Sequence, residues 1–186
     1  IKIARMAEPL TMDADIMEAE KLSCKIGVAD DAAFHLMVQD NLDLLRRAGA
    51  ELKAFSPLAD TSVPQKCQGL YLPSGYVSLY HRELSANFEM MQSIRTFVAQ
   101  GGVVYAEGDA AAYLCREMGI MGQETVPGAN ILPGAATSLS EKLEPDRFNL
   151  CLVKAVEENM ILPRNGMVHG IRDARWSIRL EEQVQQ

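Results

Sequence analysis

The sequence has no long run of Lys and Arg residues. Its 186 residues include 25 acidic and 18 basic side chains, which gives a formal net charge of −7 at pH 7. A protein that follows the phosphates of a nucleic acid needs clustered Lys and Arg, and no such run offsets the acidic balance here. We therefore expect no nucleic-acid partner.

Long apolar runs are also absent. No stretch approaches the roughly 20 apolar residues of a membrane-spanning helix, and the first 25 residues lack the basic and apolar regions of a signal peptide. With 48% hydrophobic and 23% charged residues, the composition is that of a globular domain with one core. We expect a cytoplasmic protein without a membrane partner.

Grouped metal ligands and a phosphate-binding loop are missing too. Neither the cysteines nor the histidines stand at the spacing of a metal site. In chain order they are Cys24, His35, Cys67, His81, Cys115, Cys151 and His169. No Gly-x-x-x-x-Gly-Lys-Ser/Thr loop occurs. We expect no metal and no cofactor in this chain.

Strand and helix patterns alternate from residue 26 onward. Short apolar runs predict strands and an i, i+3/i+4 spacing predicts helices, with glycine or proline between them. The predicted strands are 26–29, 51–55, 69–73 and 103–106, and the predicted helices are 41–48 and 82–100. This order is typical of an α/β fold with a mostly parallel sheet and helices on both faces, flavodoxin-like or Rossmann-like.

The two ends of the chain have weaker patterns. Residues 1–25 are expected to be a linker or N-terminal helix, and 26–186 one domain. After Met118, prolines and glycines break the chain into short pieces. Residues 148–156 and 167–178 predict antiparallel strands at the sheet edge or in a small flanking sheet.

The segment after the strand at 103–106 indicates a functional site. It turns at Gly108 into a predicted helix, which is where many α/β enzymes hold a nucleophile beside unpaired N–H groups. The strand at 69–73 ends in Ser74, Gly75 and Tyr76, and ligands gather where such strand ends meet. Glycine offers no attacking atom, so the scaffold of a nucleophilic site is predicted without its nucleophile.

Five segments carry a resemblance to a known family. They are 26–34, 40–45, 48–52, 55–60 and 69–76. Together they resemble the C-terminal glutaminase-like domain of the cobyrinic acid a,c-diamide synthase family, a relative of class I glutamine amidotransferases. The resemblance implies that the domain follows an ATP-binding synthase domain, of the same or a separate polypeptide, which would carry ATP and Mg²⁺.

Members of this family hydrolyse glutamine with a cysteine in a motif like Tyr-Ala-Glu-Cys-Gly-Gly and a histidine in a motif like Glu-Phe-His-Tyr-Ser. The first motif here reads Tyr-Ala-Glu-Gly-Asp-Ala over 105–110, so Gly108 takes the cysteine position. The second is best matched by Asp-Ala-Arg-Trp-Ser over 173–177, which puts Arg175 at the histidine position. Ser74 replaces one glycine of the family's Gly-Gly-Tyr turn.

On this resemblance both reacting groups are missing. An acyl-enzyme needs a thiolate and a base that accepts and returns a proton, whereas Gly108 has no sulfur and Arg175 stays protonated. Losing the nucleophile of a comparable unit removes on the order of 10⁶ in turnover. The Asp109 carboxylate would also sit where N–H groups should meet an oxyanion.

The residues expected to line the remaining pocket share this strand-end position or the C-terminal motif. They are Ser74, Gly75, Tyr76, Glu107, Asp109 and Asp173. We expect Arg175 to form a salt bridge with Glu107 or Asp109, with a site for a small polar ligand as the alternative.

Three functions remain open. The first is a glutaminase-like domain that is degenerate for glutamine hydrolysis and acts as a structural, docking or regulatory partner of the synthase domain, with a possible corrinoid ligand. The second is an active amidotransferase component that uses another nucleophile or free ammonia. The third is a flavodoxin-like module for an unrelated small ligand.

Overall fold

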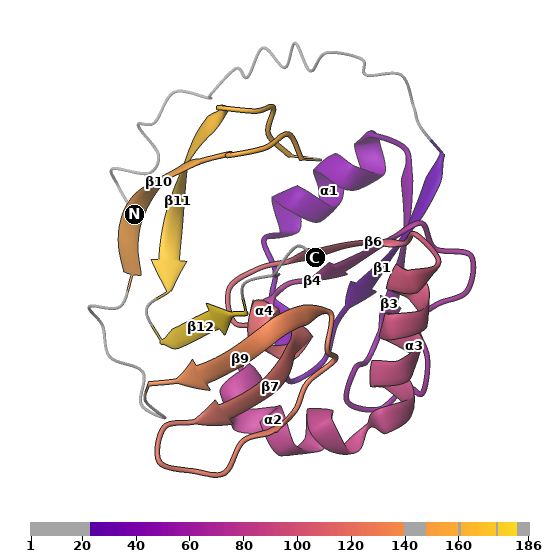
Figure 1. Ribbon diagram of the computed structural model, residues 1–186. Helices are drawn as coiled ribbons and strands as arrows, with labels where there is room; N and C mark the ends of the chain where they lie inside the picture. Colours follow the sequence, from indigo (N-terminus) through magenta and orange to yellow (C-terminus); the bar gives the residue numbers. More distant parts are fainter. Residues whose placement is uncertain (1–22, 140–147, 160, 174, 182–186) are drawn as a thin grey trace, which may run out of the picture.

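A parallel sheet forms the centre of the protein, in a computed structural model that describes residues 23–139, 148–159, 161–173 and 175–181 (Figure 1). Its strand order is β3-β1-β4-β6, and all neighbours pair in parallel. The strands are β1 (Cys24–Ala29), β3 (Ala50–Phe55), β4 (Gly69–Leu72) and β6 (Val103–Ala106). The predicted strands and the parallel sheet are confirmed.

Helices cover both faces of this sheet. They are α1 (Gln39–Arg47), α2 (Val77–Ala86), α3 (Phe88–Ala99) and the short α4 (Ala110–Leu114). Successive side chains of β4 point to opposite faces. Leu70 and Leu72 belong to the larger core, which contains Ile94 of α3, whereas Tyr71 belongs to a smaller core with Leu42 of α1. The predicted layering is therefore confirmed.

The single helix predicted over 82–100 is wrong in its extent. The structure has two helices there, separated at Asn87, whose backbone leaves the helical region at φ −83° and ψ 70°. The Asn87 Oδ1 accepts a hydrogen bond from the Met90 amide, and its Nδ2 donates to the carbonyl oxygens of Pro57 and Asp60. The apolar spacing continues across this break, which is why periodicity alone does not show it.

A second sheet follows α4. Its order is β12-β9-β7-β8, with β7 and β9 parallel and the other pairs antiparallel. The strands are β7 (Cys115–Ile120), β8 (Val126–Pro127), β9 (Leu132–Ser138) and β12 (Trp176–Leu180). The helix predicted after the turn at Gly108 is short, because it ends at Leu114 and Cys115 begins β7. Gly128 and Gly134 lie so close to other backbone that only glycine fits, which explains the broken pattern in this region.

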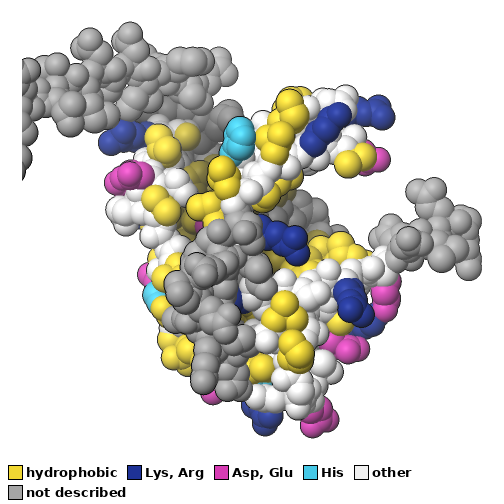
Figure 2. All heavy atoms as spheres, turned by 90° about the vertical axis from the view of Figure 1, so that its left-hand side faces the viewer, with side chains coloured by type: hydrophobic (Ala, Val, Ile, Leu, Met, Phe, Trp, Pro, Cys, Tyr) yellow, Lys and Arg dark blue, Asp and Glu magenta, His cyan; other side chains and the backbone are white. Residues whose placement is uncertain are grey.

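A small hairpin completes the described fold. β10 (Phe148–Lys154) pairs antiparallel with β11 (Met167–Asp173), so the predicted flanking sheet is confirmed. The predicted strand 167–178 is interrupted, however, because β12 joins the second sheet. The hairpin stands at one side of the molecule in Figure 1, and Figure 2 shows apolar side chains on that side. Leu150 and Ile171 of the hairpin are exposed.

Two other expectations concern the ends and the surroundings of the chain. The expected linker or N-terminal helix at 1–25 falls largely outside the described residues, although β1 already begins at Cys24. Within the described ranges, none of the helices combines the length and the apolar character that crossing a bilayer requires.

The junction at Asn87 generates a first prediction. Asn87→Ala removes the N-terminal cap of α3 and both bonds to the 57–60 loop, and we expect a loss of about 1–2 kcal/mol in the free energy of unfolding. Urea denaturation measures this loss. Gln65→Ala, at an exposed position of the neighbouring loop, is the matched control and should change stability by less than about 0.5 kcal/mol. Equal effects of the two variants would contradict the assigned role.

A second prediction concerns Tyr113, which is fully buried and whose hydroxyl has no hydrogen-bond partner among the described residues. Removing an unpaired buried hydroxyl should stabilise the protein, so we expect Tyr113→Phe to raise the free energy of unfolding by about 1 kcal/mol at neutral pH.

Burial raises the pKa of Tyr113 above its unfolded value of about 10. Above about pH 10 the Tyr113 hydroxyl therefore stays protonated in the folded state while it ionises in the unfolded state. The free energy of unfolding is unaffected by this titration below about pH 10 and falls as the pH rises further. Tyr113→Phe should weaken the fall of stability between about pH 9 and about pH 11 in urea denaturation. Tyr80→Phe is the matched control, and an unchanged slope in Tyr113→Phe would refute the assignment.

Candidate functional site

The ends of β4 and β6 meet as the sequence predicted. Leu72 is in register with Ala106, and the Glu107 amide donates a 3.0 Å hydrogen bond to the Leu72 carbonyl oxygen. Beyond this point β4 continues into the short strand β5 (Ser74–Gly75), which pairs with β2 (Phe34–Leu36), while β6 turns into α4. Two loops from distant parts of the chain are thereby brought side by side.

The turn at Gly108 has no room for a side chain. Its backbone lies in the left-handed region at φ +54°, where a residue with a Cβ atom is strained. A Cβ atom at this position would stand 2.6 Å from the Ser74 hydroxyl oxygen and 3.1 Å from the Ser74 Cβ. Ser74 therefore occupies space that a nucleophile at position 108 would require.

Asp109 ties the two loops together. Its side chain is 1% exposed, and its carboxylate accepts from the Ser74 hydroxyl at 3.0 Å and from the amides of Gly75 at 2.8 Å and Val77 at 3.0 Å. Hydrogen bonds to a charged acceptor are the strong ones, and a buried carboxylate is stable only when it is bonded in this way. The amides that face the turn are therefore already occupied.

Gly75 and Tyr76 hold the loop against the strand before α1. A Cβ atom at Gly75 would overlap the Ala33 carbonyl oxygen, so only glycine fits. The Tyr76 amide donates to the same carbonyl at 2.9 Å, and the Tyr76 ring packs against His35 with centroids 5.0 Å apart. Both residues serve the geometry of the loop in this arrangement.

Glu107 lies on the other face of the sheet. Its Oε2 accepts a 3.0 Å hydrogen bond from the Tyr71 hydroxyl, and the Tyr71 ring lies 5.6 Å from that of Tyr105. Burial and then the bond to Glu107 raise the pKa of Tyr71, while burial and then the Glu107 charge raise that of Tyr105. The structure therefore separates Glu107 from Ser74 and Asp109, with which the sequence had grouped it.

Arg175 comes directly before β12. It is 8% exposed, and its carbonyl oxygen accepts from the Leu139 amide at 2.7 Å. The salt bridges found between described residues include none from Arg175 to Glu107 or Asp109, and the expected pair stays a prediction. Asp109 is satisfied by neutral donors, and Glu107 points to the opposite face. Asp173 ends β11, and its side chain lies outside the described part.

Cys115 and His81 are buried and make local contacts. Burial raises the pKa of the Cys115 thiol, which contacts the Ala111 carbonyl oxygen at 3.5 Å. His81 is buried, with Nδ1 2.8 Å from the Ser78 carbonyl oxygen. Among the described residues, no group of three or more His, Cys, Asp or Glu side chains could hold a metal ion.

Sequence reasoning missed Asp31 as a second organiser of this sheet edge. Its Oδ1 accepts from the amides of Ala33 and Phe34, and its Oδ2 accepts from the Ser56 hydroxyl and the Leu58 amide. One carboxylate thus joins the loops after β1 and β3. The sequence indicates this role only weakly: Asp31 follows one predicted strand closely, and a Ser-Pro pair follows the next strand.

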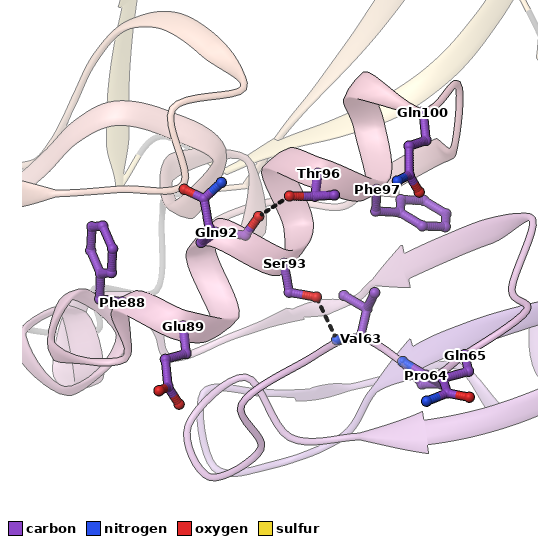
Figure 3. A pocket seen from close by; sticks show the side chains of 10 residues that line it. All are labelled: Val63, Pro64, Gln65, Phe88, Glu89, Gln92, Ser93, Thr96, Phe97 and Gln100. Atoms are coloured by element: carbon purple, nitrogen blue, oxygen red, sulfur yellow. Dashed lines mark hydrogen bonds between the residues drawn. The ribbon is translucent and has the colours of Figure 1, made fainter.

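A cavity of about 560 Å³ lies away from this edge, between α3 and residues 63–65 (Figure 3). The Ser93 hydroxyl oxygen accepts from the Val63 amide across it, and the Thr96 hydroxyl bonds back to the Gln92 carbonyl. Among the described residues that line it, Glu89 is the only charged one, and it is exposed. None of the predicted site residues is part of this described lining.

The fold and the turn at Gly108 define the class: a class I glutamine amidotransferase-like α/β domain. The chain belongs to the family of CobB/CobQ-like glutamine amidotransferase domains, whose model matches residues 25–160. The resemblance noted from the sequence is thereby confirmed at the level of the family.

Similar proteins point to the same family. The chain is 35% identical over 145 residues to a cobyrinate a,c-diamide synthase of Salmonella typhimurium, covering 78% of the chain and 31% of the relative. It is 32% identical over 173 residues to the corresponding protein of Listeria innocua, covering 91% and 37%. A hydrogenobyrinate a,c-diamide synthase of Stutzerimonas stutzeri is 44% identical over 112 residues, covering 60% and 26%. The chain thus spans about a third of the length of such relatives.

The contact between positions 74 and 108 generates a third prediction. In the unchanged protein Gly108→Ala meets both a left-handed backbone and the Ser74 side chain, and should cost about 2–4 kcal/mol. In a Ser74→Gly background only the backbone term of about 1–2 kcal/mol should remain. A double-mutant cycle by urea denaturation measures the difference. Identical costs in the two backgrounds would show that the contact has no energetic consequence.

Proposed function

We propose that this chain is the glutaminase-like domain of a protein related to cobyrinate a,c-diamide synthase and that it does not hydrolyse glutamine. In this role it serves as a structural, docking or regulatory partner of an ATP-dependent amide-forming domain in cobalamin biosynthesis. Family membership and the names of the relatives support the pathway. The arrangement of Ser74, Gly108 and Asp109 supports the loss of hydrolysis.

The observation that carries the proposal is the filled turn. A hydrolytic site of this kind needs a nucleophile at the turn and free N–H groups for the developing oxyanion. Here position 108 has no side chain, the space for one is limited by Ser74, and the amides of Gly75 and Val77 bind Asp109. These three features oppose both requirements at one place, which supports the proposed loss of hydrolysis.

A partner role rests on the length of the relatives. They are about three times as long as the matched segment, so most of each relative lies outside this domain. ATP and Mg²⁺ would be bound by that other part, and this chain would contribute a folded surface beside it. A corrinoid or a small polar ligand remains a proposed ligand of the assembled protein.

The second candidate is an active amidotransferase component. Its support is the Ser74 hydroxyl, which lies 3.0 Å from a carboxylate oxygen of Asp109 at the same turn. A carboxylate that already accepts two amide bonds is a poor base for a serine, so this observation favours the candidate only weakly. Incubating the full-length polypeptide with ATP, cobyrinic acid and either glutamine or ammonium separates the two candidate functions. Formation of the amide product with ammonium but not with glutamine supports the proposal.

A restoration experiment gives the fourth prediction. The unchanged protein should release glutamate from glutamine at the background rate, because it lacks the thiolate. Gly108→Cys alone should not restore hydrolysis, since Ser74 and Asp109 remain. We expect a fourfold variant to produce glutamate measurably above background in a coupled glutaminase assay. It combines Ser74→Gly, Gly108→Cys, Asp109→Gly and Arg175→His.

The control is Gly101→Cys, which places a thiol at another glycine in the left-handed region. A Cβ atom at position 101 would have no atom within 4 Å other than those of its chain neighbours. This variant should stay inactive, and circular dichroism checks that all variants are folded. Glutamate release by the unchanged protein at an ordinary enzymatic rate would refute the proposal. Loss of that release in Ser74→Ala would then identify the serine as the nucleophile.

A further inference from the structure

A cavity of about 570 Å³ opens on the α1 face of the parallel sheet, where no site residue other than Glu107 lies. Leu44 and Leu45 of α1 form one wall. The floor is formed by Tyr71 of β4 and by Val103 and Tyr105 of β6. Val103 is 42% exposed and Tyr105 is 40% exposed, so helix α1 leaves this part of the sheet open to solvent. The cavity is large enough for a small organic molecule.

Its chemistry is asymmetric. Among the described lining residues Glu107 is the only charged one, and most of the others are aliphatic or aromatic. The carboxylate uses its Oε2 for the Tyr71 hydroxyl, and the two tyrosine rings beside it are tilted at 40° with centroids 5.6 Å apart. A negative group beside two aromatic faces attracts a cation twice, by direct charge and through the ring quadrupoles.

We propose that this cavity, lined by Tyr71, Tyr105 and Glu107, binds a small organic cation: an ammonium or amidinium group held at Glu107, attached to an apolar body that covers Val103 and the leucines of α1. This site is separate from the Gly108 turn and does not depend on the proposed function. Ligands with carboxylates at this position are disfavoured, because Glu107 would repel them and the described lining has no basic side chain.

The test uses three probes with one aromatic body and different heads: phenethylammonium, phenethyl alcohol and phenylacetate. Titration of the 186-residue chain, followed by amide chemical shifts in NMR, should give saturable shifts around Tyr105 and Glu107. The ammonium should bind about tenfold tighter than the alcohol, as expected for one charged hydrogen bond in a half-buried site. Phenylacetate should bind more weakly than the alcohol.

Two variants test the residues. Glu107→Gln keeps the shape and an acceptor for Tyr71, and should lower the affinity for the ammonium to that for the alcohol. Tyr105→Leu, at a partly exposed position, should weaken both the ammonium and the alcohol. Glu124→Gln, an exposed acidic residue that does not line the cavity, is the matched control and should change nothing.

The proposal is overturned if the ammonium gives no saturable shifts, if the three probes bind equally, or if Glu107→Gln leaves the preference unchanged. If another segment of the chain covers the cavity, the ammonium probe will give no saturable shifts. The glutaminase assay tests the turn at Gly108, whereas the titration tests the cavity on the α1 face of the sheet. The proposed function and the proposed cation site can therefore fail independently of each other.

Discussion

The Asp109 carboxylate is the constraint on which this sheet edge depends. It is buried and bound by one hydroxyl and two backbone amides from the loop that follows β4. A buried carboxyl group needs hydrogen-bond donors, and the loss of one of these three would leave it partly unpaired. The position of Ser74, the path of the chain into α2 and the turn at Gly108 all follow from this single acceptor.

The contacts that stabilise the turn are also the ones on which the proposed loss of hydrolysis rests. A serine at position 74 completes the set of donors for Asp109, and its side chain fills the space beside Gly108. Glycine at 108 then removes the strain of a left-handed residue with a side chain. The three residues form a consistent structural unit, and each makes a nucleophile at this turn harder to accommodate.

The sequence predicted the parallel sheet and its layering because short apolar runs and helical spacing are local properties. It failed at Asn87, where a side chain ends one helix and begins another without disturbing the apolar stripe. It also failed in the second sheet, where strands are held by pairing between residues far apart, such as Trp176 with Ser138.

Motif comparison located the turn at Gly108 but not the faces of its neighbours. Glu107 and Asp109 are two residues apart, yet the end of β6 directs Glu107 toward Tyr71, while the turn carries Asp109 to the loop of Ser74. The donors that the structure gives Asp109 are a hydroxyl and two amides of a loop distant in sequence, which no motif indicates. The role of Asp31 depends on loops that meet only in the folded chain.

The most direct measurement of the central claim is covalent capture by a glutamine analogue with an electrophilic carbon, read out by intact-protein mass spectrometry and peptide mapping. The account predicts that the folded, unchanged protein gains no adduct whose formation is blocked by excess glutamine, because the turn has no nucleophile. A single adduct that glutamine protects against, mapped to Ser74 or to a residue in contact with the turn, would contradict the account.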